Sequence, residues 1–281
     1  MNISAIETFL AIVRTGNLNR ASERLNVTQS TVTARLDVLE QALGQRLLIR
    51  SRKGATLTKA GYAFLGHAEL MVETWRHAQS KAGLPKGFSG IFSLACHFDL
   101  WHDLGEVWVA EKRTELSDLA FETWPGEDGR VGSWLQSGLI DAALLMQPVT
   151  GPGISSHIFT EERLVQVSDH QRRVKSWDPA YIYVDNGQDF RRQHAEAWPE
   201  DNTAYMTVGS ADWGVKHLLN EGGSAYLPWR MVRRYIEAGR LYLIDGAPEF
   251  QRKCYISWRQ QSLIDFPWLG QQWHFPEKPL E

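Results

Sequence analysis

The chain has 281 residues and 43% hydrophobic side chains, enough for a small module and a body of about two further domain-sized lobes. No apolar run reaches the roughly 18 residues that a membrane-spanning helix needs, and no signal-like apolar segment follows Met1. The two cysteines, Cys96 and Cys254, lie far apart without a pairing pattern, which argues against a disulfide framework. We therefore expect a cytoplasmic protein that does not associate with membranes.

The net charge of −3 hides an uneven distribution along the chain. Residues 1–60 hold nine Lys and Arg against four Asp and Glu, a local charge of +5, whereas the remaining residues carry −8. A basic module on an acidic body is the charge pattern of a nucleic-acid-binding protein.

Two helices are expected within the first 25 residues, because apolar side chains recur there at helical spacing. The first helix should end near Gly16, and Asn17 can cap a short second helix. The first apolar stripe consists of Ile6, Phe9, Leu10 and Val13, and the second consists of Leu18, Ala21 and Leu25.

A third helix is expected to begin after Thr28, its N-cap, and to end before Gly44. Its apolar stripe consists of Val32, Leu36, Leu39 and Leu43. Beside the stripe, an arc of about 140° near the N-terminus carries short side chains without negative charge. These side chains are Gln29, Ser30, Thr33 and Ala34. They suit a helix in a DNA major groove, where Gln pairs with adenine and Ser or Thr contacts bases or phosphates. The alternative is an ordinary capped helix whose polar face has no function.

The segment "RLLIRSRKGATLT" at residues 46–58 alternates and turns at Lys53-Gly54, which predicts a two-stranded wing. Its basic residues are Arg46, Arg50, Arg52 and Lys53. A helix, a short helix, a tight turn and a polar-faced helix follow the order of a helix-turn-helix, with the third helix as the DNA reader.

The stretch "FLAIVRTGNLNRASERLNVTQSTVTARLDVLEQALGQRLLIRSRKGATLTKAG" resembles the winged helix-turn-helix of LysR-type transcriptional regulators. The motif is specific because the cap, the reader helix, "LE…LG…L…R" and "LT.AG" recur together at fixed spacing. The resemblance implies a regulator that binds double-stranded promoter or operator DNA of dyad symmetry. The DNA-binding residues that we predict are Thr28, Gln29, Ser30, Thr33, Arg35, Arg50, Arg52 and Lys53.

The module departs from the usual family pattern at several positions. Ala34 and Asp37 stand where basic residues are common, and Arg35 stands where Gln is common. Asn19-Arg20 replace small residues near the second helix. These departures concern the operator sequence and some phosphate contacts rather than the fold.

A long helix, "TKAGYAFLGHAELMVETWRHAQSKAG", is expected after Thr58, its cap. Its apolar residues have coiled-coil spacing, and a module this small offers little to bury against, so we favour a dimerising seam over a core helix of one chain. The seam consists of Leu65, Ala68, Val72 and Trp75, flanked by Phe64, Met71 and Ala78. A hinge at Gly83, Pro85 and Gly87 follows. We expect self-association as a homodimer or homotetramer.

Strands and helices alternate from residue 88 onward, which predicts an α/β sheet with crossover connections. Strands are expected at 90–96, 118–124, 141–147, 163–169, 181–186, 204–210 and 224–229, and helices at 100–113, 130–138, 188–198 and 211–223. The resemblance implies two Rossmann-like lobes, as in periplasmic binding proteins. The chain would cross to the second lobe near Glu161 and return near Leu243, so that "KCYISW" becomes a strand of the first lobe.

We therefore predict a multidomain α and α/β protein. Residues 1–58 would form the winged helix-turn-helix DNA-binding domain, and 59–87 the dimerisation linker helix and hinge. Residues 88–281 would form the effector-binding domain, with lobe I at about 88–160 and 244–281 and lobe II at about 161–243.

Ligands of such sheets bind outside the carboxyl ends of the strands, near helix N-termini. The residues there that we predict to bind the effector are Cys96, His97, Phe98, Trp124, Met146, Gln147 and Ser210. In LysR-type proteins the matching positions surround the inducer pocket, and Ser210 with its neighbouring amides could hold a carboxylate. His97 and Asp99 stand where small hydroxyl residues are more usual, and Trp124 adds bulk, so an aromatic or larger effector is favoured. The alternative for His97 is a helix cap.

Enzyme chemistry finds little support in the sequence. Cys96, His97 and Asp99 are close in sequence, but side chains at a strand end point apart, whereas a base must meet its nucleophile. Cys96, His97 and His102 lack the paired spacing of zinc ligands, and no nucleotide-binding glycine motif is present. We therefore predict no catalysis, no metal and no cofactor.

Two functions remain open. The first is a sequence-specific transcriptional regulator controlled by a small organic effector between the two lobes, with RNA polymerase as a further candidate partner. The alternative is a small-molecule binding protein of the periplasmic-binding-protein fold without effector-coupled gene control. The basic winged module favours the regulator.

Overall fold

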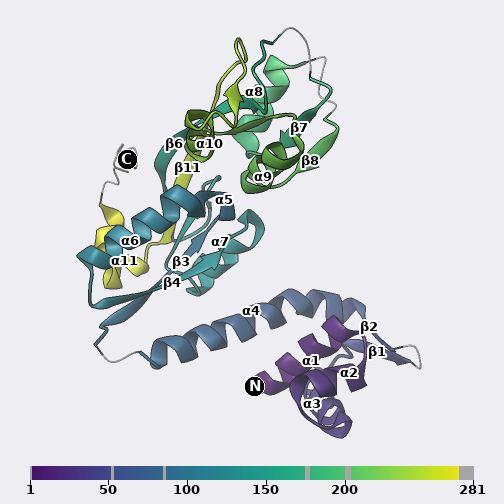
Figure 1. The fold of residues 1–281 in the computed structure, drawn as a ribbon. Helices are drawn as coiled ribbons and strands as arrows, with labels where there is room; N and C mark the ends of the chain where they lie inside the picture. Colours follow the sequence, from purple (N-terminus) through teal and green to yellow (C-terminus); the bar gives the residue numbers. More distant parts are fainter. Residues whose placement is uncertain (1, 52–53, 85–86, 175–177, 200–203, 272–281) are drawn as a thin grey trace. The chain divides into compact units, whose positions relative to one another are not determined.

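The computed structural model describes residues 2–51, 54–84, 87–174, 178–199 and 204–271 (Figure 1). The chain divides into two compact units, Met1–Lys86 and Gly87–Glu281. Each unit has its own hydrophobic core. Within the described ranges, no helix combines the length and the apolar character needed to cross a bilayer.

Unit 1, residues 1–86, is a winged helix-turn-helix followed by a long helix, as the sequence predicts. Its helices are α1 (Ile3–Thr15), α2 (Leu18–Leu25), α3 (Gln29–Leu43) and α4 (Lys59–Ala82). Strands β1 (Leu48–Ser51) and β2 (Gly54–Leu57) pair antiparallel as the wing. The predicted N-caps are confirmed, because Asn17, Thr28 and Thr58 each accept a backbone N–H of the helix that follows, at 2.8, 3.2 and 3.0 Å.

The apolar stripe of α3 is buried except at its end. Val32 and Leu36 are fully buried and Leu39 is nearly so, whereas Leu43 is 41% exposed. The prediction of a buried Leu43 is therefore wrong. Leu43 is the last residue of α3, and Gly44, whose φ is +65°, turns the chain away directly after it.

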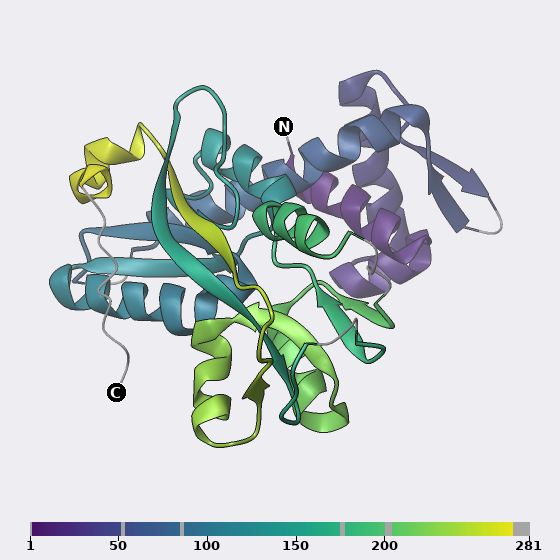
Figure 2. The same cartoon turned by 90° about the horizontal axis from the view of Figure 1, so that it is seen from above.

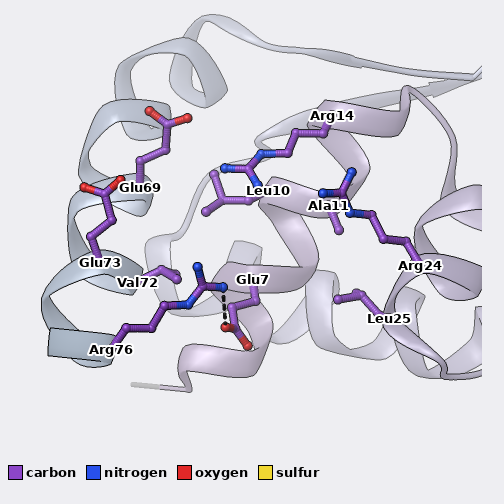
Figure 3. A pocket seen from close by; sticks show the side chains of 10 residues that line it. All are labelled: Glu7, Leu10, Ala11, Arg14, Arg24, Leu25, Glu69, Val72, Glu73 and Arg76. Carbon is purple, nitrogen blue, oxygen red and sulfur yellow. Dashed lines mark hydrogen bonds and ion pairs between the residues drawn. The ribbon is translucent and has the colours of Figure 1, made fainter. Parts of the chain in front are cut away.

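The long helix α4 packs on α1 of the same chain. Ala68 and Val72 are 0% and 3% exposed within the core of unit 1, and Val72 lines the same pocket as Leu10 and Ala11 (Figure 3). The prediction that Ala68 and Val72 form an inter-chain seam is therefore wrong, since side chains this buried offer no surface to a partner. Trp75, another predicted seam residue, is 47% exposed.

Unit 2, residues 87–281, contains a single sheet, which has nine strands in the described part of the chain. The sheet order is β4-β3-β5-β11-β6-β9-β7-β8, and β10 pairs with β6. The strands are β3 (Gly90–Cys96), β4 (Leu119–Pro125), β5 (Ala142–Leu145), β6 (Ile154–Ser168), β7 (Tyr181–Val184), β8 (Met206–Val208), β9 (Ser224–Pro228), β10 (Tyr242–Leu243) and β11 (Phe250–Arg259).

Helices cover both faces of the sheet in each half of unit 2. They are α5 (Phe98–Leu100), η1 (Trp101–Gly105), α6 (Glu106–Glu115), α7 (Asp128–Ser137), α8 (Gln188–Ala197), α9 (Ala211–Glu221), α10 (Trp229–Glu237), α11 (Ser262–Asp265) and η2 (Pro267–Gly270). Side chains alternate along the strands: Leu94 and Cys96 pack with Trp108 of α6, whereas Ala95 packs with Val131 of α7. Both faces are apolar because both are covered.

Strands β6 and β11 join the two halves of the sheet (Figure 2). They pair antiparallel from Ile154 with Arg259 to Leu164 with Phe250. The half on one side holds β3, β4 and β5, which we call lobe I, and the half on the other side holds β7, β8 and β9, which we call lobe II. β11 also pairs with β5, so "KCYISW" is a lobe I strand as predicted.

Three details differ from the sequence prediction. The expected helix at 100–113 is broken, because His102 and Asp103 leave helical backbone angles and Asp103 has φ +65°. Strand β6 begins at Ile154 rather than at residue 163. Helix α10 was not predicted, because no element was expected between residue 229 and residue 243.

Candidate nucleic-acid interface and effector site

The N-terminal turn of α3 presents polar side chains at the surface of unit 1. Thr28, Gln29 and Ser30 are exposed, and Thr33 and Arg35 are half-buried. The hydroxyl of Thr28 lies 2.9 Å from that of Ser30, so both face the same side of the helix start. Within the described residues, the side chain of Gln29 makes no hydrogen bond. Its amide can therefore donate and accept, as pairing with adenine requires.

The wing is tied to the reader helix by an ion pair. Arg50 of β1 lies 2.5 Å from the carboxylate of Asp37 on α3 and 3.8 Å from that of Glu40. Glu40 is buried and accepts the backbone N–H groups of Leu47 and Leu48 at 2.7 and 3.1 Å. The Arg50 guanidinium, a predicted DNA contact, therefore already has internal carboxylate partners. Two other predicted contacts, Arg52 and Lys53, lie outside the described residues.

The predicted effector residues of lobe I lie at neighbouring strand ends. β4, β3 and β5 run parallel, with Cys96 beside Pro125 and Leu144, so their carboxyl ends share one edge of the sheet. Phe98 is 41% exposed and stacks on His97, with ring centroids 4.3 Å apart. His97 also caps α5 by accepting the backbone N–H of Asp99 at 3.2 Å, the alternative that the sequence left open.

The other predicted effector residues of lobe I differ widely in solvent exposure. Trp124 is 50% exposed, Gln147 is half-buried and Met146 is buried. A β-carbon at Gly187, in lobe II, would lie 3.7 Å from Met146, so the strand-end edges of the two lobes meet there. Cys96 is also buried, and burial raises the pKa of its thiol to about 12, which leaves the thiol protonated and unreactive.

Ser210 lies at the start of α9, as predicted, but its hydroxyl is already engaged. It donates to a carboxylate oxygen of Asp99 at 2.8 Å, and the backbone N–H of Ala211 donates to the other oxygen at 2.8 Å. The N–H of Asp212 is 3.5 Å from the first oxygen. Asp99 and Ser210 are both 2% exposed. A carboxylate of lobe I therefore fills the place where the sequence predicted an effector carboxylate.

The Asp99 segment also contacts an ionic cluster, which is formed by Glu162 of β6, Arg252 of β11 and Arg230 of α10. Arg252 donates to Glu162 at 2.8 Å, and the two residues face each other across the β6–β11 pair. Arg230 also donates to Glu162, and it donates to the backbone carbonyls of Asp99 and, at 2.7 Å, His102. The cluster therefore connects lobe II to the segment that carries Asp99.

In this cluster two guanidinium groups share one carboxylate. Burial raises the pKa of Glu162, but the Arg252 and Arg230 guanidinium groups outweigh it and hold the pKa at about 2. Glu162 is therefore ionised at neutral pH. Burial and the neighbouring Glu162 carboxylate raise the pKa of Cys254, whose thiol donates to Glu162 at 3.3 Å.

Sequence reasoning missed three residues of this site, Arg230, Glu162 and Arg252. Glu162 lies between Glu161 and Arg163, and Arg252 lies between Gln251 and Lys253, so both residues belong to polar stretches that look exposed in the sequence. Their burial follows only from the pairing of β6 with β11. Arg230 lies on the helix that was not predicted. Asp99 was noted as unusual for the family, but its partner, Ser210, is 111 residues away in the chain.

A winged helix-turn-helix with an exposed polar reader helix, joined to a two-lobed α/β domain, defines a DNA-binding regulator that carries a ligand-binding domain. The pattern of the bacterial regulatory helix-turn-helix proteins of the lysR family matches residues 3–62, and that of the LysR substrate binding domain matches residues 87–266. The second match alone covers more than half of the chain. The protein belongs to the LysR family of DNA-binding transcriptional regulators.

Relatives and solved structures agree with this assignment. The HTH-type transcriptional regulator HdfR of Salmonella schwarzengrund is 26% identical over 265 residues, 93% of this chain and 94% of the relative. HdfR of Salmonella typhimurium gives the same values. These relatives are transcriptional regulators rather than enzymes.

Two solved structures of one LysR regulator, CbnR, show the same fold. CbnR has a TM-score of 0.71 at 18% identity, and the match covers 93% of both chains. Full-length CbnR complexed with its target DNA also has a TM-score of 0.71 at 18% identity, over 95% of this chain and 98% of that chain. The predicted fold class, the DNA-binding function and the effector-binding domain are confirmed, and a carrier without gene control is not favoured.

Proposed function

We propose that α3 reads an operator of dyad symmetry through Gln29, Ser30 and Thr33, while Thr28 and Arg35 help to position the helix on the DNA. The exposed polar start of α3 carries this proposal, because Gln29 and Ser30 lie at the surface with polar groups that can pair with base edges. The protein would bind such an operator as a dimer or tetramer, so that two readers reach two half-sites. It would act in the cytoplasm, where the DNA is, and would catalyse no reaction.

The test begins with a genome-wide footprint that identifies the bound sites. Gln29→Ala should then weaken binding to the identified operator by about 1–3 kcal/mol and leave binding to random DNA nearly unchanged. Gln41→Ala is the matched control, since Gln41 is exposed near the other end of α3. Fluorescence anisotropy measures both affinities. An equal loss on operator and random DNA would make Gln29 a backbone contact instead.

We further propose that a small organic effector binds where the strand ends of the two lobes meet. The exposed rings of Phe98, which stacks on the half-buried His97, and of Trp124 provide an aromatic surface at the strand ends of lobe I, which suits an aromatic effector. Cys96 and Met146 are buried, so they would shape the floor rather than contact the effector through polar groups. Binding would shift the arrangement of the lobes and thereby change DNA affinity.

A library of aromatic compounds tests this second proposal by thermal unfolding of the full chain. A compound that raises the Tm of the wild type should lose its effect in Phe98→Ala and keep it in Phe121→Ala, which removes a half-buried ring of the same lobe. An effector whose stabilisation survives Phe98→Ala and Trp124→Ala would bind elsewhere.

A further inference from the structure

The N-terminus of α9 holds a carboxylate that comes from the same chain. Asp99 lies on α5 in lobe I, and its two oxygens accept the Ser210 hydroxyl and the Ala211 N–H in lobe II, both at 2.8 Å. A third donor, the N–H of Asp212, lies 3.5 Å away. An external anion at a helix N-terminus is bound through the same kinds of donor and the same helix dipole.

Burial makes this contact strong. The side chains on both sides are almost inaccessible to water, so the charge-assisted hydrogen bonds are not weakened by solvent competition. Ser210 Oγ and the Ala211 N–H already have the Asp99 oxygens as partners, so neither donor is available to a second anion. An incoming carboxylate would have to displace Asp99 and leave a buried charge without its partners.

The backbone of Asp99 is held independently of its side chain. Arg230 of lobe II donates to the Asp99 carbonyl and to the His102 carbonyl, while its Nε donates to Glu162. The Asp99 segment is therefore anchored to lobe II from two directions. One anchor is the helix N-terminus of α9, and the other is the buried ionic cluster of Glu162, Arg252 and Arg230.

We propose that Asp99 is a built-in ligand, which occupies the anion position between the lobes and holds them together without an effector. This proposal rests on the proposed function for the place of the effector site, and it narrows the class of effector. The effector cannot be anchored by a carboxylate at Ser210. It is uncharged at that end and contacts the exposed aromatic side of the site at His97, Phe98 and Trp124.

Removal of the Asp99 carboxylate should open the position to a small external carboxylate. We would follow thermal unfolding of the full-length wild type, Asp99→Ala and Asp99→Asn in sodium acetate and in sodium chloride of equal ionic strength. Asp212→Ala is the matched control, because Asp212 is an acid in the first turn of α9 whose carboxylate pairs with Lys216 at 2.6 Å instead.

Asp99→Ala should have a lower Tm than the wild type, and acetate at about five times its Kd should raise that Tm by about 2–4 °C. Wild type, Asp99→Asn and Asp212→Ala should show no difference between acetate and chloride, since their anion position is filled. If Asp99→Ala is unfolded in chloride, recovery of its circular dichroism signal in acetate replaces the Tm as the readout.

An acetate response of the wild type that Ser210→Ala abolishes would overturn the proposal, because an external carboxylate would then reach the site. Absence of any acetate response or recovery in Asp99→Ala would overturn it as well. Measurement of operator binding by the same variants tests the proposed function separately from the built-in ligand. If acetate binds Asp99→Ala while operator affinity stays constant, the built-in ligand stands and the coupling between effector site and DNA fails.

Discussion

Helices α3 and α9 both begin at a hydroxyl N-cap, but the start of α3 is exposed whereas the start of α9 is buried. Each has a hydroxyl residue as N-cap, Thr28 or Ser210, and each was predicted to bind a partner through its first turn. Around α3 the polar groups are exposed, and the Thr28 hydroxyl contacts only its own first turn. Around α9 they are buried against Asp99 from another part of the chain. A helix start thus identifies a potential site, but only the surrounding fold decides whether the site is open.

The same distinction applies within unit 1 itself. The start of α3 is open, whereas the wing residue Arg50 already has an internal acid, Asp37, as its partner. Each internal ion pair reduces what a basic or polar group can offer to an external ligand. The predictions below test this difference between open and occupied groups, in order of expected effect.

The largest effect is expected for Glu162→Gln, which removes the acid shared by Arg252 and Arg230. The buried Arg252 and the partly buried Arg230 would keep their charge and lose their main partner, at a cost of about 3–5 kcal/mol in the free energy of unfolding. Urea unfolding of unit 2, followed by Trp fluorescence, measures the change. Glu161→Gln is the control, since Glu161 is exposed and 4.0 Å from Lys253, and it should cost less than about 1 kcal/mol. Equal effects of both variants would mean that the cluster does not join the lobes.

Acid should weaken the same cluster. The pKa of Glu162 in the folded protein is about 2, below the ordinary 4.5, so its contribution is fully present above about pH 4.5 and is lost as pH falls toward 2. This difference corresponds to about 3 kcal/mol. Urea unfolding at several pH values should therefore show that the difference in the free energy of unfolding between wild type and Glu162→Gln becomes smaller below pH 4.5. A gap that stays constant down to about pH 2.5 would contradict the assignment.

The two helix caps should differ when each hydroxyl is removed. Ser210→Ala deletes a buried hydrogen bond to a carboxylate and should cost about 2 kcal/mol in the stability of unit 2. Thr28→Ala deletes an exposed cap and should cost about 1 kcal/mol in unit 1. Denaturant unfolding followed by far-ultraviolet circular dichroism compares them. A larger loss for Thr28→Ala would reverse the distinction between the open and the occupied helix start.

The smallest effect is expected for Asp37→Ala, which frees Arg50 for a DNA phosphate. Affinity for any DNA sequence should increase by a few fold, and the slope of log K against log salt should become steeper by about 0.9. Titrations at several salt concentrations measure the slope. Asp37→Ala combined with Arg50→Ala is the control and should return the wild-type slope. A slope unchanged by Asp37→Ala alone would show that Arg50 does not reach phosphate.

The sequence predicted most of the fold because it carries strong local signals. Helical stripes and capping residues located α1, α2 and α3, and short apolar runs located β3, β5 and β7. The break at His102 and Asp103 has no such signal, since the positive φ of Asp103 depends on its surroundings. Ala68 and Val72 have spacing that fits both a coiled coil and a core helix, so periodicity alone could not separate the two.

The candidate sites were predictable to different degrees for a physical reason. The predicted DNA-reading residues of α3 are neighbours on one helix, so their spacing in sequence fixes their arrangement in space. The effector site depends on pairs such as Asp99 with Ser210 and Glu162 with Arg252, which only the tertiary fold brings together.

The long pairing of β6 with β11 limits how the two lobes can move. Lobes joined by single flexible strands can swing apart about a few peptide bonds, but here ten residues of β11 follow β6 through the boundary. The register of this pair shifts between Cys254 and Tyr255, where Phe159 is the extra residue of a β-bulge. Bulges increase local twist. A signal that passes through unit 2 should therefore travel as torsion of a two-stranded ribbon rather than as the opening of a hinge.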